Sequence, residues 1–154
     1  MKLNKMFDGF NDLYGIETKE LDHNLEGMFE IVGSEYDEMT EEIHSGNLLF
    51  LPNPHDFVKE GLDVIYAMAQ QLRERGVDLD AGLAELHRSN MSKRLHGFDP
   101  KRHDRELQEA QKRYPKAKLE VTNHGFVMKC GETGKLIKPT TYSPAEVTDE
   151  MIGL

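Results

Sequence analysis

Apolar residues recur at helical spacing in three stretches of this chain. In each stretch they come every three or four residues, which is the pattern of one buried stripe on an amphipathic helix. The pattern therefore predicts three helices between residues 28 and 86. The stripes are Met28, Val32, Tyr36, Met39 and Ile43 in the first stretch, Phe57, Gly61, Val64, Ile65, Met68 and Leu72 in the second, and Leu79, Leu83 and Leu86 in the third.

The connection between the first two predicted helices allows them to run antiparallel. Residues 39–59 supply enough positions to finish one helix, turn through Pro52-Asn53-Pro54-His55 and start the next. The two helices can then pack side by side, so that matching flanks face each other.

Beyond the third helix the period changes. Asp104–Tyr114 is predicted to be a short polar helix that Pro115 ends. Lys118–Cys130 alternates like a strand broken at Asn123-His124-Gly125. These elements make residues 94–133 a helix and hairpin appendage.

A second turn is predicted at Gly131-Glu132-Thr133-Gly134. It would fold Phe126–Met128 back on Leu136–Ile137 as a β-hairpin. The predicted fold class is all-α, an antiparallel helical bundle with a small C-terminal β-hairpin appendage, within a single domain of residues 1–154.

Two pairs of acidic residues lie on the first two helices. At about 100° per residue, Glu35, Glu38 and Glu42 share one flank of the first apolar stripe. Glu60 and Asp63 occupy the equivalent flank of the second. The four acids of Glu35-x-x-Glu38 and Glu60-x-x-Asp63 can therefore meet across the helix pair.

Facing carboxylates repel one another unless a cation lies between them. Oxygen ligands of this kind suit Mg²⁺ or Mn²⁺, which also take phosphate oxygens as ligands. The alternative is an acidic, solvated face, since the chain has 28 Asp and Glu among 154 residues.

The third helix ends in a polar stretch that could contact phosphate. Lys93 is a mobile positive charge, and the Asn90 amide can donate to phosphate or sugar oxygens. Alternatively, residues 90–92 simply end the helix and Lys93 favours its negative C-terminus.

The combination of these motifs resembles the MazG-like, all-α nucleoside triphosphate pyrophosphohydrolases, the superfamily that also holds dimeric dUTPases. The likeness covers residues 25–93 and resumes at Gly134-Lys135-Leu136-Ile137-Lys138-Pro139. It implies Mg²⁺-dependent cleavage of a (d)NTP between the α and β phosphates, giving (d)NMP and pyrophosphate. It also implies a homodimer or homotetramer, with a four-helix core formed together with a partner subunit.

The resemblance assigns roles to individual residues. The implied metal ligands are Glu35, Glu38, Glu60 and Asp63, and Glu35 is our candidate for the base that takes a proton from the attacking water. Relatives often have one more acid where this chain has Ser34, so a metal position is missing or is filled by Glu42. The implied substrate-binding residues are Asn90, Lys93, Lys135, Lys138 and Tyr142, and Tyr142 either stacks on a base or packs.

Two other functions stay open. Phosphoribosyl-ATP pyrophosphohydrolase shares the implied architecture and differs in substrate. A non-catalytic, dimeric helical binding module would use the same acids for solubility and the basic hairpin for a partner.

Charge divides the chain into acidic and basic segments. Residues 1–92 hold 19 acidic and 7 basic side chains, whereas residues 93–138 hold 6 acidic and 12 basic ones. This division fits a metal-bound phosphate ligand. The net charge of −9 argues against nucleic acid as a partner.

Composition adds two expectations. No stretch has the roughly 20 apolar residues of a membrane span, and the first residues lack a signal-peptide core. A single cysteine fits a cytoplasmic protein.

Overall fold

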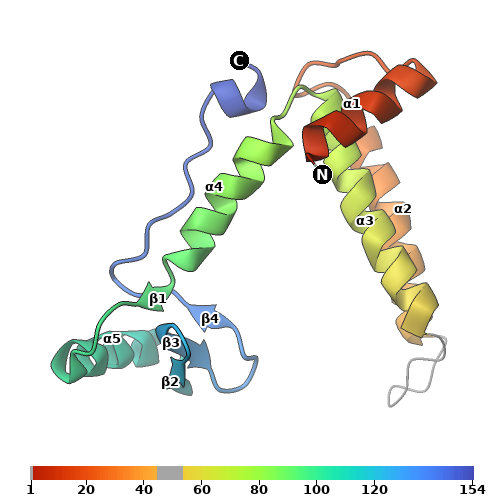
Figure 1. The fold of residues 1–154 in the computed structure, drawn as a ribbon. Helices are drawn as coiled ribbons and strands as arrows, with labels where there is room; N and C mark the ends of the chain where they lie inside the picture. The colour runs from red at the N-terminus through yellow and green to blue at the C-terminus, as the bar shows by residue number, and fades with distance from the viewer. Residues whose placement is uncertain (1, 45–53) are drawn as a thin grey trace. The chain divides into compact units, whose positions relative to one another are not determined.

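The computed structural model of this protein describes residues 2–44 and 54–154. Within these ranges the chain forms five α-helices and a small antiparallel sheet of four strands (Figure 1). A mainly helical chain with a β appendage is thus confirmed, while the bundle completed by a partner subunit stays a prediction. The chain divides into two compact units, residues 1–82 with 147–154, and residues 83–146.

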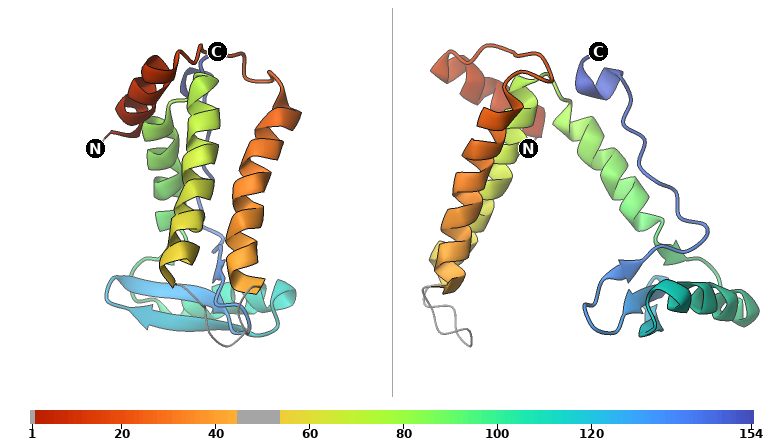
Figure 2. Two further views of the ribbon diagram at one scale, coloured as in Figure 1. Left: turned by 90° about the vertical axis from the view of Figure 1, so that its right-hand side faces the viewer. Right: turned by 180° about the vertical axis from the view of Figure 1, so that it is seen from behind.

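The first unit is built around a pair of long helices. α2 (Leu25–His44) and α3 (Pro54–Glu74) run antiparallel and lie side by side in all three ribbon views (Figures 1 and 2). α1 (Leu3–Tyr14) packs against α3. The start of α4 (Leu79–Met91) and a 3₁₀ turn, η1 (Glu150–Ile152), complete this unit.

The three predicted helices are confirmed as α2, α3 and α4. The stripe predicted for α4 is wrong beyond its first residue, because Leu79 is buried whereas Leu83 and Leu86 are exposed. α3 begins at Pro54, a residue whose missing N–H costs nothing at the first position of a helix. The predicted turn also includes Pro52 and Asn53, which lie outside the described residues.

The packing of α2 on α3 corrects two positions of the predicted stripes. Met28 is buried, and a Cβ at Gly61 would lie 3.6 Å from Met39 Sδ, so these residues do face the partner helix. By contrast, Tyr36 is 53% exposed and Ile65 is 66% exposed. Both lie at the edge of the apolar arc, where the facing helix does not reach.

No element is predicted for residues 3–14, which form α1, although Phe7, Phe10 and Tyr14 recur at helical spacing. The Phe7 ring is fully buried and lies 4.8 Å from the Tyr66 ring on α3. The Asp80 carboxylate accepts a hydrogen bond of 3.0 Å from the Leu3 N–H, so a distant residue satisfies the first turn of α1.

The second unit combines a sheet with one covering helix. Its strands are β1 (Arg94–Leu95), β2 (Ala117–Thr122), β3 (Gly125–Cys130) and β4 (Leu136–Ile137). β3 is central, because β1, β2 and β4 all pair with it antiparallel. α5 (Pro100–Arg113) packs beside β2 (Figure 2).

Both predicted turns do join antiparallel strands, although β4 pairs with Met128 and Lys129 and not with Phe126 and Val127. Thr122 pairs with Gly125 across the first turn, and Met128 pairs with Ile137 across the second. Gly125 has φ +130°, and a Cβ there would lie 3.0 Å from the Leu95 carbonyl oxygen, so only glycine fits.

Two elements of this unit differ from the prediction. α5 starts four residues earlier than Asp104, because Asp99 caps it by accepting a hydrogen bond of 3.1 Å from the Arg102 N–H and Pro100 follows at the first position. The short strand β1 was not predicted, since two residues carry no periodicity. Its Leu95 is nevertheless completely buried.

The core of the second unit lies between α5 and the sheet. Its buried apolar residues are Leu95, Ala110, Ala117, Met128, Cys130 and Ile137. His103 of α5 is also buried, with its ring 4.4 Å from that of Phe126.

Among the helices of the described ranges, none combines the length and the apolar character that a membrane crossing needs.

Candidate functional site

Three of the four predicted metal ligands come together on the helix pair. One carboxylate oxygen each from Glu35 and Glu38 on α2 and from Glu60 on α3 lie within 4.8 Å of one another. The one-turn spacing of the α2 pair and the antiparallel packing produce this cluster. Three negative charges this close favour a divalent cation as their common partner.

Glu60 is the most constrained member of this cluster. Its side chain is only 13% exposed. Oε1 accepts a hydrogen bond of 2.7 Å from Lys59 Nζ, whereas Oε2 is buried and has no hydrogen-bond partner within residues 2–44 and 54–154. A buried carboxylate oxygen without a partner is costly, so this atom fits a metal ligand.

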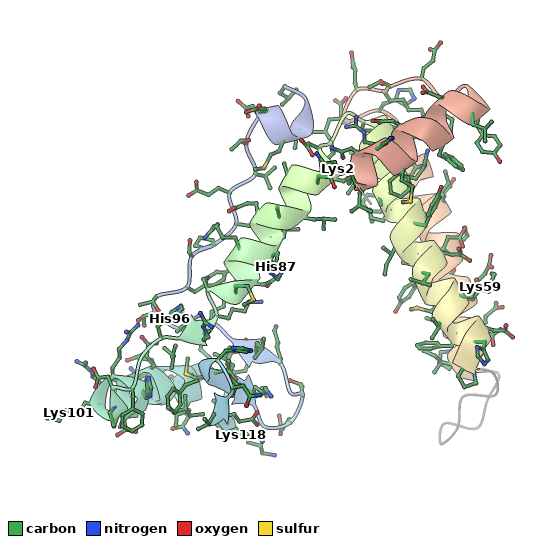
Figure 3. The ribbon with its side chains drawn as sticks, viewed as in Figure 1. Lys2, Lys59, His87, His96, Lys101 and Lys118 are labelled. Carbon is green, nitrogen blue, oxygen red and sulfur yellow. The ribbon has the colours of Figure 1, made fainter. Side chains whose placement is uncertain are left out.

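The fourth predicted ligand, Asp63, is not part of the cluster. It is one turn from Glu60 with a side chain that is 43% exposed, and its Oδ2 lies 3.1 Å from Lys59 Nζ. The Lys59 ammonium, labelled in Figure 3 where α3 begins, therefore bridges both α3 acids. These two carboxylates raise the pKa of Lys59 above its usual value.

The position that Ser34 occupies contributes nothing to this cluster. Ser34 Oγ donates a hydrogen bond of 2.8 Å to the Ile31 carbonyl oxygen. Glu42, the predicted replacement for the missing acid, is not among the carboxylates that the described chain brings together here.

Lys59 competes with a metal ion for the α3 carboxylates. We expect Lys59→Gln to bind Mn²⁺ about three- to tenfold more tightly in the absence of nucleotide, because a cation no longer has to displace the ammonium group. Titration followed by electron paramagnetic resonance measures this affinity. Lys2→Gln removes the same charge from the α1 end of this unit (Figure 3), and an equal gain in that variant would contradict a local effect.

The second group of predicted residues lies around the end of α4. Lys93 Nζ donates a hydrogen bond of 2.6 Å to Asn90 Oδ1. This contact joins the two residues that the resemblance implies for phosphate binding. It is also compatible with the alternative that they simply end the helix.

A clamp not predicted from the sequence holds the chain after β4 against α4. Arg88 donates to both Glu85 carboxylate oxygens, at 2.7 and 2.6 Å, and to the Pro144 carbonyl oxygen at 2.9 Å. The Ser143 N–H donates to Ser92 Oγ at 2.9 Å. The Glu85 and Arg88 spacing of three residues was the available signal, since it suits a helical ion pair.

This clamp places Tyr142 and Lys138 beside α4. The Tyr142 hydroxyl lies 2.8 Å from Ser89 Oγ, and Lys138 Nζ lies 4.4 Å from the centre of the Tyr142 ring. The hydrogen bond with Ser89 and, to a lesser extent, the charges of Lys138 and Lys93 lower the pKa of the phenol, against the effect of desolvation. Both ends of the Tyr142 side chain are thus engaged, which favours packing over stacking on a base.

The clamp should open in acid. Arg88 and then the Glu146 N–H hold the pKa of Glu85 at about 2, below the ordinary value of 4.5. Because the folded-state pKa is lowered, the stabilisation from the Glu85 carboxylate is complete above pH 4.5 and is lost as the pH falls through about 2. We expect the hydrogen-exchange protection factor of the Glu146 amide to fall in that window.

Glu85→Gln provides the control for this pH dependence. It removes the charge at every pH, so the Glu146 amide should be weakly protected already at pH 7. An amide that stays equally protected in this variant and in the parent at pH 7 and pH 2 would show that the ion pair does not hold the segment.

Three predicted substrate-binding lysines line one groove of the second unit. Lys93, Lys135 and Lys138 border a cavity of about 580 Å³ between α5 and the chain around β4. Sequence reasoning missed the contribution of Arg113 and Tyr114 to the same wall, since nothing in a polar helix marks which side will face a cavity.

Comparison with protein-family models, with curated proteins and with solved structures found no match for this chain. The likeness to the MazG-like enzymes therefore rests on the motifs and spacings themselves.

Proposed function

We propose that this protein is a Mg²⁺-dependent nucleoside triphosphate pyrophosphohydrolase that converts a (d)NTP to (d)NMP and pyrophosphate. The observation that carries the proposal is the cluster of Glu35, Glu38 and Glu60, in which Oε2 of Glu60 is buried and has no hydrogen-bond partner among the residues that the structure describes. A solvated acidic face does not explain that atom, because a carboxylate with no metal would gain more by turning to water.

The residues of the first unit would have the following roles. Glu35, Glu38 and Glu60 would hold the cation, and Asp63 could join them once Lys59 is displaced. Bound Mg²⁺ or Mn²⁺ would neutralise phosphate charge and would lower the pKa of the attacking water. Glu35 is the candidate for the group that accepts the proton of that water.

The bond changes of the proposed reaction are those of anhydride hydrolysis. The oxygen of water bonds to one phosphorus atom of the α–β anhydride, and the bond from this phosphorus to the bridging oxygen breaks. The electron pair of that bond leaves with the departing phosphate group, and Glu35 receives one proton. In the second unit, the basic side chains Lys93, Lys135 and Lys138 are of a kind suited to phosphate groups.

The exposed apolar residues of the helix pair support a homodimer or homotetramer. Phe29 and Tyr36 on α2 and Val58, Leu62 and Ile65 on α3 are all exposed. By helical geometry they lie on the flank opposite the clustered acids. A partner could therefore cover this surface and leave the proposed metal centre open.

The proposed function is tested by measuring pyrophosphate release from the common dNTPs and NTPs and from phosphoribosyl-ATP, with and without Mg²⁺ or Mn²⁺. Metal-dependent release from one or two of the dNTPs or NTPs is expected. Release from phosphoribosyl-ATP alone would replace the proposal with its close enzymatic alternative. No release by the folded protein would favour the binding-module alternative.

A further inference from the structure

The groove of the second unit is lined by more positive than negative side chains. Its charged lining residues are Lys93, Arg113, Lys135 and Lys138 on the one hand and Glu106 and Glu109 on the other. The cavity of about 580 Å³ is within the size range of small-molecule sites and is larger than one phosphate group needs.

Both carboxylates of this groove already have partners. Glu106 is buried and accepts hydrogen bonds from the Thr140 N–H, at 2.8 Å, and from the Thr140 hydroxyl. Glu109 pairs with Lys112 at 2.5 Å. Neither carboxylate is thus paired with a cation of the groove.

Two cations of the groove have no such partner. For the guanidinium of Arg113 and the ammonium of Lys135, the described part of the chain offers neither an ion pair nor a hydrogen bond. Lys138 is placed by its contact with the Tyr142 ring. Arg113 at the end of α5 and the two lysines that flank β4 therefore place exposed positive charge on two segments around one cavity, which favours a bound anion.

We propose that this groove binds a chain of phosphate groups and that Arg113 is a principal contact. An arginine can hold phosphate oxygens with two parallel hydrogen bonds, while lysines provide charge along a longer ligand. The positive charge of the groove rests on the structure alone, whereas the choice of an oligophosphate rests on the proposed function. Arg113 belongs to the inserted segment 94–133, so the motifs that resemble the MazG-like enzymes do not include it.

The ligand could be a nucleotide or a free oligophosphate, which share this chemistry. Tyr114 also lines the groove while it packs against the core of this unit. The part of its ring that borders the groove offers a surface for a base. A nucleotide would then bind more tightly than its phosphate chain alone.

Calorimetric titration of the full chain without metal tests this site. Tripolyphosphate, pyrophosphate and a dNTP are titrated in buffer with a chelator, so that the acidic cluster of the first unit takes no part. We expect saturable binding of one ligand per chain. Both Arg113→Gln and Lys135→Gln should weaken it about tenfold or more, since each loses a charged hydrogen bond.

Lys101→Gln is the matched control for both variants. Lys101 lies in the first turn of α5 (Figure 3) and does not line the groove, so its replacement removes the same charge from the same unit. The affinity of Lys101→Gln for each ligand should stay within twofold of the affinity of the parent. Circular dichroism of all three variants confirms that each is folded.

Two results would overturn the proposal: no saturable binding of any of the three ligands by the parent, or equal weakening in Lys101→Gln and Arg113→Gln. A dNTP that binds at least tenfold more tightly than tripolyphosphate identifies a nucleotide site, and equal affinities identify a site for the phosphate chain alone. Because binding is measured without metal, it can persist in a protein that releases no pyrophosphate, and the two proposals fail separately.

Discussion

Glu60→Gln is expected to lose pyrophosphate release by roughly 10²- to 10³-fold or more, without loss of helical structure. The change keeps the size of the side chain but removes the charge of Glu60, whose Oε2 is buried and has no hydrogen-bond partner in the described part of the chain. Electrostatic groups of this kind account for a large share of catalysis in phosphate chemistry. Weaker Mn²⁺ binding should accompany the loss of rate.

Stability should respond to Glu60→Gln in the opposite direction. Glu35 and Glu38 repel Glu60 when no metal is bound, so a neutral amide relieves that repulsion. The Lys59 contact that is lost is exposed and contributes little. We therefore expect the metal-free free energy of unfolding to stay equal or to rise, as measured by urea denaturation.

Asp37→Asn is the control for Glu60→Gln. Asp37 is an exposed acid of α2 that is not part of the cluster, so its replacement removes one negative charge from the same helix without removing a clustered carboxylate. Its turnover should match that of the parent. Full activity of Glu60→Gln, or equal losses in both variants, would contradict the proposed metal centre.

Leu62→Glu is expected to convert the protein to a monomer. Leu62 is 60% exposed at the centre of an apolar stripe on α3 with Val58 and Ile65. A charge at this position would be buried without a partner in an interface between two copies, at a cost of several kcal/mol. The chain of 17.6 kDa should sediment as a dimer or tetramer in the parent and as a monomer in the variant.

Val121→Glu is the control for the loss of assembly. Val121 is an exposed apolar residue of β2 in the second unit, so Val121→Glu introduces the same charge at an apolar position of another surface. A parent that is itself a monomer, or a Leu62→Glu variant that assembles like Val121→Glu, would show that the α3 stripe is not the interface. Sedimentation equilibrium distinguishes these outcomes.

Local patterns were sufficient for most of the secondary structure. The periods of α2, α3 and α4 predict those helices, and the glycine-containing turns predict both hairpins, because spacing and turn chemistry act over a few residues. The start of α5 was missed although Asp99 and Pro100 signal it. α1 was missed because its aromatic residues pack against Tyr66, which lies more than fifty positions away.

The sequence by itself determined which residue types are available for chemistry and which of them share a helix face. It predicts that Glu35 and Glu38 can meet Glu60, since one-turn spacing and an antiparallel connection leave few other arrangements. It also predicts a basic segment that follows an acidic one. These properties depend on local spacing or on composition, so they can be read from the sequence without knowledge of packing.

Only the tertiary structure decided how each of these side chains is engaged. It buries Oε2 of Glu60 and leaves Asp63 half-exposed. It also places Lys59 between the two acids and makes Arg113 line the same groove as Lys135. Burial and pairing depend on contacts between segments far apart in the chain, and no spacing along one helix encodes those contacts.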